Sequence, residues 1–354
     1  MRKKLQVFLA IILFSNLSFG QDNFWTKTSE EKLKMNEKMD RNFYPSKSQL
    51  FHLDFNAFKQ LLLSAPMENS TLSSNLVLQF PDYEGNLKKY KVFEAPVMEQ
   101  ELTDKFPTIR SYSAQGIDDP TSTLRFSVTN FGLHVMSLSG EKGTYYIDTF
   151  TKDLNNYIVY SRKDIQKTRS FGCFVQDNDS AFESGRGYEN QVLVNDGNLR
   201  QYRLAISNTI EYAAYHLTAA GTPGTATLAQ KKAVVLSAMV VSLTRLNGIY
   251  EREMAVRMNL VANNDLVIFI DSDSYTNSPD MINEIQPIVD GLIGSANYDM
   301  GHGFCTTDSG IAQLASVCGA GKARGITGQA NPVGDLFDVD YVAHEMGHQF
   351  GANH

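Results

Sequence analysis

The sequence has few of the features that mark membrane or nucleic-acid proteins. It has only three cysteines, no long basic tract, and a formal net charge of -7 over 354 residues. Without a basic tract, neither nucleic acid nor an anionic membrane is expected as a partner. No internal apolar run approaches the roughly 20 residues of a membrane-spanning helix. We therefore expect a soluble protein without a membrane span, long enough for two folded units.

The cysteine count is odd, which leaves at least one thiol outside any intramolecular pairing. Cys305 and Cys318 lie close together in the sequence and could close a short loop by a disulfide, and Cys173 would then stand alone. Disulfides persist in oxidising compartments. The pattern is compatible with an exported protein.

The first twenty residues have the organisation of a secretory signal peptide. The basic residues Arg2–Lys4 precede an apolar run at Val7–Phe14, and small residues, Ser18 and Gly20, occupy the positions before a cut at Gln21. A retained N-terminal anchor is the alternative, but the apolar run is short for one. We expect residues 1–20 to be removed and the protein to be secreted to the extracellular space.

Residues 21–169 are predicted to form a mostly β domain. Its histidines, His52 and His134, occur singly, which favours packed or surface roles over a metal site. Turn residues separate runs with the composition of strands. The clearest such runs are Leu124–Val128, Tyr145–Asp148 and Tyr157–Tyr160.

A polar, glycine-rich segment at residues 170–198 is predicted to be a linker, and helical and strand periodicity resumes in residues 199–354. Alternating strands and helices favour an α/β layer structure. The predicted elements are strands around Tyr202–Ile206, Met254–Leu260 and Leu266–Ile270, and helices at Thr227–Leu246 and Asp280–Ile293.

The residues with the clearest chemistry are the last eleven. His344 and His348 are four residues apart, so on a helix both imidazoles can reach one metal ion. Glu345 falls beside the metal, where a general base takes a proton from water. Gly351 permits a sharp turn after the helix, which can return His354 as a third ligand.

Three nitrogen ligands leave one coordination position open, which is typical of catalytic rather than structural zinc. Val342, Met346 and Phe350 would anchor the opposite face of the helix in the core. The alternative is an amphipathic helix with incidental histidines. The full spacing arises by chance with a frequency on the order of 10⁻⁵ in a chain of this length. It predicts one catalytic Zn²⁺.

The spacing H-E-x-x-H-x-x-G-x-x-H is identified as the metzincin zinc signature. Residues of about 200–354 resemble the adamalysin or reprolysin-like (M12B) metalloproteases of bacterial type. The similar segments are Tyr298–Phe304, Gly310–Ala312, Cys318 and Lys322–Gly325. The resemblance implies an α/β (α+β) metzincin-like catalytic domain with a mixed sheet and a zinc-binding helix. It is preceded by a mostly β propeptide domain.

The resemblance also assigns roles to residues. His344, His348 and His354 would bind zinc, and Glu345 would activate water. Residues 310–316, with Gly310, Ile311 and Ala312 at their start, would form an edge strand that pairs with an extended peptide or protein substrate.

Related zymogens block the metal with a propeptide thiolate, a role that Cys173 could fill as an inhibitory zinc ligand. The segment around Cys173, residues 171–175, does not match the matrix-metalloprotease consensus. A buried or intermolecularly paired cysteine is the alternative.

The family has a methionine turn after its third histidine, and this sequence ends at His354. We therefore expect the sequence to be a fragment, and the truncated chain to bind zinc weakly and to be inactive. The predicted function is a secreted zinc endopeptidase precursor that interacts with its own propeptide. The alternatives are a non-catalytic zinc-containing binding or adhesion module and a hydrolase of small molecules or cell wall.

Three further features are weaker. Asp271–Asp273 opens like a calcium loop, but Thr276 and Ile282 stand where such a loop needs glycine and glutamate. Ca²⁺ is therefore unsupported. His216 and His302 fall outside the signature spacing and are predicted to be structural histidines in loops.

Overall fold

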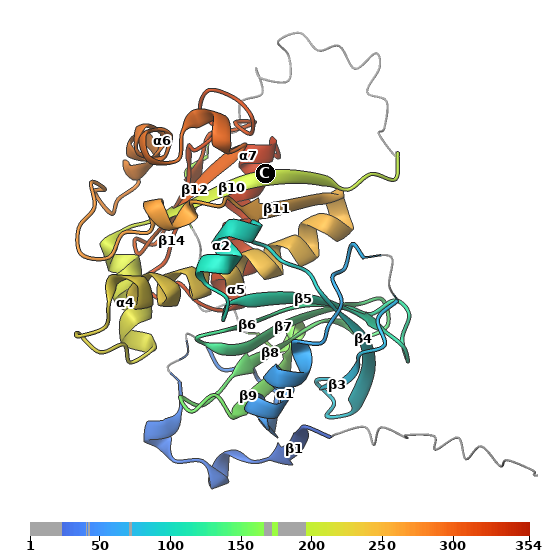
Figure 1. Cartoon of the computed structure of the whole chain (residues 1–354). Coiled ribbons are helices and arrows are strands. Elements are labelled where there is room, and N and C mark those ends of the chain that lie inside the picture. Colours follow the sequence, from blue (N-terminus) through green and yellow to red (C-terminus); the bar gives the residue numbers. More distant parts are fainter. Residues whose placement is uncertain (1–22, 40, 42, 71–72, 166–171, 176–195) are drawn as a thin grey trace, which may run out of the picture.

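The computed structural model describes residues 23–39, 41, 43–70, 73–165, 172–175 and 196–354, which form two β-sheet units (Figure 1). The predicted signal peptide and most of the predicted linker lie outside the described residues. The N-terminal unit is β-rich and the C-terminal unit mixes helices with a sheet. Both agree with the fold classes predicted from sequence.

The N-terminal unit is one antiparallel sheet of nine strands, in the order β1-β2-β9-β8-β7-β6-β5-β4-β3. The sheet curls toward a barrel, because the Trp25 indole N–H in β1 donates to the Gln79 carbonyl in β3. Helix α1 (Phe55–Leu62) covers the interior with Phe58 and Leu62. The strands are β1 (Trp25–Thr28), β2 (Gln49–Leu53), β3 (Val77–Pro81), β4 (Leu87–Glu94), β5 (Arg110–Gly116), β6 (Thr123–Thr129), β7 (Gly132–Ser139), β8 (Gly143–Thr149) and β9 (Asn156–Ser161).

The C-terminal unit contains a five-stranded mixed sheet, in the order β11-β10-β12-β14-β13. Its pairs are parallel except β13 with β14, so β13 is an antiparallel edge strand. The strands are β10 (Arg200–Asn208), β11 (Val256–Leu260), β12 (Met300–Cys305), β13 (Ser309–Ala312) and β14 (Gly325–Gly328). The helices are α4 (Ile210–Ala219), α5 (Leu228–Met254), α6 (Met281–Leu292) and α7 (Ala343–Phe350).

Two details differ from the predicted elements. The predicted strand Leu266–Ile270 is wrong: residues Asn264–Val267 form a 3₁₀ turn. The Asn264 side chain both accepts from the Ile206 N–H and donates to the Ile206 carbonyl, which takes the place of strand pairing. Helix α4 was not predicted, although Ile210, Ala213, Ala214 and Leu217 stand at helical spacing.

Helix α5 corrects the expectation that no segment approaches membrane-spanning length. It has 27 residues with a mean hydropathy of 1.5 in its most apolar window, which by length and composition would suffice to cross a membrane. However, 89% of that window is buried inside the fold. The helix lies between the C-terminal sheet and the N-terminal sheet (Figure 1), as expected of a core helix.

One large hydrophobic cluster contains residues of both units. Apolar residues around helix α2 (Gln100–Lys105), including Met98 and Phe106, pack in the same cluster as the buried residues of α5. Beside α2 the backbone extends the C-terminal sheet. The Leu260 N–H in β11 donates to the Val97 carbonyl at 2.8 Å, and the Glu99 N–H donates to Leu260 at 2.9 Å. The N-terminal unit therefore covers the β11 edge of the sheet.

Buried charges also cross the interface. Arg245 of α5, only 2% exposed, donates to Asp148 of the N-terminal unit and to Asp338 at 2.8 Å. A second network alternates two acids and two arginines from both units: Glu68, Arg125, Glu251 and Arg257. Breaking a buried pair leaves an uncompensated charge, so these networks make the docked arrangement specific.

Two histidines at this interface predict how stability depends on pH. Burial lowers the pKa of His216 to about 3. Burial also lowers the pKa of His134 to about 4; the Asp148 carboxylate opposes this shift, whereas Arg245 and Arg41 add to it. The unfolded chain takes up these protons near pH 6.5 and the folded chain does so only well below it. The free energy of unfolding should therefore fall as the pH drops below about 6.5, by up to about 1.4 kcal/mol per pH unit from each histidine. When the free energy of unfolding is measured by urea denaturation at several pH values, it should fall less steeply with decreasing pH in His216→Phe than in wild type. An unchanged slope would contradict this role.

Candidate metal centre

Helix α7 is built to present one polar face. A π-helical segment (Leu336–Val342) runs into α7, and the helix ends at Gly351, whose φ of 104° lies in the left-handed region that glycine favours. Val342 and Met346 are fully buried, and Phe350 packs edge-to-face on Tyr202. The predicted anchoring face is therefore present, and the histidines take the other side.

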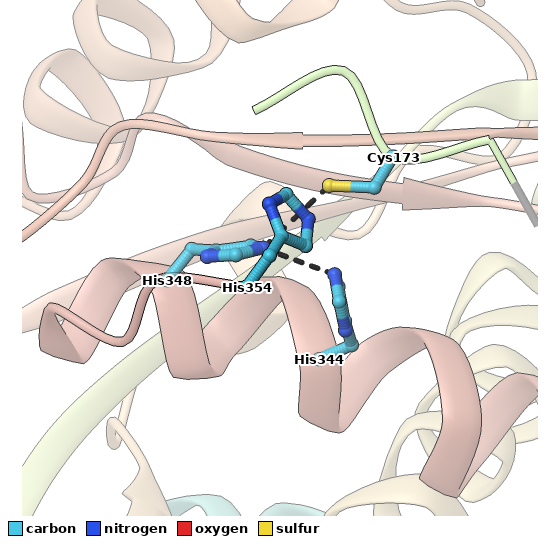
Figure 2. Close-up of side chains that lie close together, drawn as sticks. All are labelled: Cys173, His344, His348 and His354. Atoms are coloured by element: carbon cyan, nitrogen blue, oxygen red, sulfur yellow. Dashed lines mark hydrogen bonds between the residues drawn. The ribbon is translucent and has the colours of Figure 1, made fainter. Parts of the chain in front are cut away.

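The three predicted histidine ligands and Cys173 converge on one point. Figure 2 shows His344 and His348 on α7, His354 turned back after the helix, and Cys173 facing them from another segment. The Nε2 atoms of His344 and His348 are 3.0 Å apart, and Cys173 Sγ lies 3.5 Å from Nε2 of His348. One ligand atom from each of the four lies within 4.8 Å of all the others.

This cluster suits a tetrahedral zinc ion. With zinc–nitrogen bonds of about 2.0–2.1 Å and a zinc–sulfur bond of about 2.3 Å, the ligand atoms of such a site lie roughly 3.3–3.7 Å apart. His348 Nδ1 lies 2.6 Å from the Ala352 carbonyl. Donation to that carbonyl leaves the lone pair on Nε2, the form in which imidazole binds a metal. Within the described residues, no other group of His, Cys, Asp and Glu side chains converges in this way.

Glu345 lies beside the cluster in an unusual state for a carboxylate. Its side chain is fully buried, and neither oxygen has a hydrogen-bond partner at normal geometry. Burial raises its pKa to about 7, and the nearby Cys173 thiol opposes that rise. Buried carboxylates are normally paired. This one remains available to a group that enters the site.

Cys173 is held in place by backbone pairing with the edge strand. The Gly310 N–H in β13 donates to the Gly172 carbonyl at 3.1 Å, and the Phe174 N–H donates to the Gly310 carbonyl at 2.9 Å. The two segments run parallel. The upstream chain thus covers the second edge of the C-terminal sheet, directly beside the histidines.

The predicted edge strand at residues 310–316 is present but shorter. It contains Gly310, Ile311 and Ala312, and ends there because the chain turns at Ala315, whose φ is 51°. The Ala315 N–H then donates to the His348 carbonyl at 3.0 Å. The segment after β13 therefore caps the C-terminal end of α7 and ties the edge strand to the metal-binding helix.

The predicted disulfide between Cys305 and Cys318 is wrong, and both are unpaired thiols. Cys305 is buried at the end of β12, whereas the Cys318 N–H donates to the Asp299 carbonyl just before β12 begins. A strand rises about 3.3 Å per residue, so the two cysteines are roughly 20 Å apart. A disulfide requires Cα atoms within about 7 Å.

Sequence reasoning missed a polar bridge behind the site. His302 was predicted in a loop, but it is fully buried in β12, where Nδ1 lies 2.7 Å from Gln349 Oε1 and Nε2 lies 2.9 Å from Thr327 Oγ1. The Gln349 amide also donates to the Gly301 carbonyl at 2.9 Å. The bridge fixes α7 against the sheet. The position of Gln349 next to His348 is the only hint of this bridge in the sequence, because no local pattern pairs Gln349 with β12.

The segment Asp271–Asp273, which opens like a calcium loop in sequence, orders the local backbone. Asp273 accepts from the Ile210 N–H at 2.6 Å, at the start of α4, and from the Tyr275 N–H at 3.0 Å. Its oxygens therefore order the loop and the first turn of a helix.

The bridge behind α7 makes a stability prediction. In Gln349→Leu, His302 keeps its burial but loses a partner, which should lower the free energy of unfolding by about 1–3 kcal/mol. Gln313→Leu, at an exposed position, is the control and should change it by less than about 0.5 kcal/mol. Urea denaturation measures both. Equal changes in the free energy of unfolding of the two variants would show that the bridge does not stabilise the fold.

Comparison with known proteins agrees with this geometry. No curated protein matches the chain. A family model described as metallopeptidase family M12B, reprolysin-like, matches residues 236–354, which include most of α5, all of α6, the strands from β11 to β14 and α7. Residues 236–354 are therefore a reprolysin-like domain of metallopeptidase family M12B, and the cluster at its C-terminal end is its candidate metal site.

Proposed function

We propose that the chain belongs to the precursor of a secreted zinc-dependent endopeptidase, in which Glu345 is the general base and His344, His348 and His354 hold the metal. The observation that carries the proposal is the buried, unpartnered carboxylate of Glu345 beside three converging imidazoles. A purely structural zinc site needs the histidines, but has no use for a buried carboxylate without a partner.

The residues divide the chemistry among themselves. His344, His348 and His354 would hold the zinc ion, which would supply Lewis acidity for activating water and polarising a peptide carbonyl. Glu345 accepts the proton of the attacking water and then delivers it to the departing amine. A pKa raised to about 7 suits both steps, because a general base works best near the operating pH. The His348 contact with the Ala352 carbonyl keeps its ring oriented throughout.

The substrate would be an extended peptide that pairs with β13. Gly310 already pairs through both its N–H and its carbonyl with another extended segment of this chain. An edge strand that accepts one extended backbone can accept another. Main-chain pairing would hold the scissile bond beside the histidines without requiring a particular side chain.

The N-terminal unit would act as the propeptide, and Cys173 as the group that keeps the precursor latent. Its thiol lies at a coordinating distance from the histidine cluster, and its backbone lies along β13. The same three residues, Gly172–Phe174, would thus block both the metal site and the edge strand to which a substrate would bind. Export through the N-terminal signal segment remains part of the proposal.

Glu345→Gln tests catalysis. The amide keeps the volume but cannot take a proton, so we expect hydrolysis of an unfolded protein substrate to fall by about 10²–10⁴-fold once the N-terminal unit has been removed from both proteins. Zinc content, measured by metal analysis, should not change. His348→Ala is the control and should lose both zinc and activity.

The competing function is a zinc-containing binding or adhesion module without catalysis. It would be favoured if wild type and Glu345→Gln both retain zinc and neither hydrolyses substrate faster than a chelator-treated sample.

Cys173→Ser tests latency. Serine is a weaker zinc ligand than a thiolate, so the uncleaved variant should hydrolyse a labelled peptide at least roughly tenfold faster than uncleaved wild type, equivalent to about 1.4 kcal/mol. Cys318→Ser changes an exposed thiol outside the cluster and should match wild type. Equal rates in all three proteins would remove Cys173 from the latency mechanism.

A further inference from the structure

A second polar site lies between the two units, away from the histidine cluster. A cavity of about 110 Å³ is lined by Arg41 and His134 of the N-terminal unit and by His216 of α4 and Arg245 of α5. One water needs roughly 10–15 Å³, so there is room for more than one. Among the described residues, every buried side-chain nitrogen that lacks a hydrogen-bond partner belongs to one of these four side chains.

The two arginines each leave the same atom unused. Arg245 uses its terminal nitrogens on Asp338 and Asp148, and Arg41 donates from Nη1 to the Thr149 carbonyl at 3.2 Å. Nε of both arginines has no partner. An arginine Nε carries a hydrogen at every accessible pH and can only donate. Each of these nitrogens therefore requires an acceptor.

The acidic groups of the cavity are already engaged. Asp148 accepts from Arg245 and from the Tyr160 hydroxyl, and Asp338 accepts from Arg245 and from Ser242. The lining thus has donors in excess and no carboxylate left to satisfy them. A cation would add to the positive charge of the arginines, whereas an acceptor of negative charge would complement it.

The histidines strengthen this bias. Both ring nitrogens of His216 lack a partner, and its ring is enclosed by Phe131, Tyr212 and Tyr215. His134 Nδ1 lacks a partner, while its Nε2 is 3.9 Å from Asp148. Protonation would turn each ring into a donor at both nitrogens. The charged groups facing His134 are Asp148, Arg41 and Arg245, so a proton there would be better tolerated with a counter-ion in the cavity.

We propose that this cavity is a binding site for a small monovalent anion, such as chloride or acetate, held by Nε of Arg41 and Arg245 and by the rings of His134 and His216. Because both units contribute donors, the bound anion stabilises their docked arrangement. Acid strengthens its binding by adding donors. The inference concerns assembly rather than catalysis, so it does not depend on the proposed peptidase activity.

The test is thermal unfolding of the full chain in sodium chloride or sodium acetate against sodium gluconate, at constant ionic strength and at neutral pH. Gluconate has the same charge but is much bulkier than chloride or acetate. We expect a saturable rise of the midpoint, about 2 °C at roughly ten times the dissociation constant. The rise should grow as the pH is lowered toward the depressed pKa values of His134 and His216, about 4 and about 3.

Variants separate this site from general salt effects. His216→Phe keeps the aromatic packing and removes both ring nitrogens. His134→Phe makes the same change at the second histidine of the cavity. Each should lose most of the chloride-specific rise. His52→Phe makes the same change at an exposed position of β2 and should keep it.

Chloride NMR linewidths provide a reading that does not depend on unfolding. They should broaden with wild type and with His52→Phe, and not with His216→Phe. The proposal is overturned if chloride and gluconate give the same midpoint in wild type, which would leave water as the occupant. It is equally overturned if His216→Phe folds and keeps the full rise.

Discussion

The arrangement of the site depends on one short backbone pairing, in which Gly172–Phe174 lies along Gly310 of the edge strand. Two hydrogen bonds fix the register, and that register alone brings the Cys173 thiol to 3.5 Å from His348. A shift by one residue would turn the side chain to the other face of the strand. Because β13 continues into the segment that caps α7, the same pairing links the edge strand, the histidine cluster and the upstream chain.

The N-terminal unit contacts the C-terminal unit well beyond the histidine cluster. It occupies the edge of the C-terminal sheet at Leu260 and shares a hydrophobic cluster with α5, while Gly172–Phe174 occupies the other edge at Gly310. Its charged groups alternate with those of the C-terminal unit, and at Arg245 the alternation is fully buried. These contacts explain why a helix as apolar as α5 belongs to a core here. They also place the donor-rich cavity where it joins the two units.

What could be predicted from the sequence was mostly local. The helix α7, the turn at Gly351 and the convergence of His344, His348 and His354 follow from spacing over eleven residues, and they are present. The strand predicted at Leu266–Ile270 failed because the Asn264 side chain, and not a neighbouring strand, satisfies the backbone. The disulfide failed because closeness in sequence says nothing about the two ends of β12. The partners of Cys173 and Gln349 depend on contacts between distant segments, which no local pattern encodes.

The central claim is that Cys173 ligates the same metal as the three histidines. X-ray absorption at the zinc edge of the zinc-loaded, uncleaved chain tests it most directly. The account predicts one sulfur neighbour at about 2.3 Å together with nitrogen neighbours at about 2.0–2.1 Å. It also predicts that the sulfur disappears in Cys173→Ser and persists in Cys318→Ser. A first shell of nitrogen and oxygen alone in wild type would contradict it.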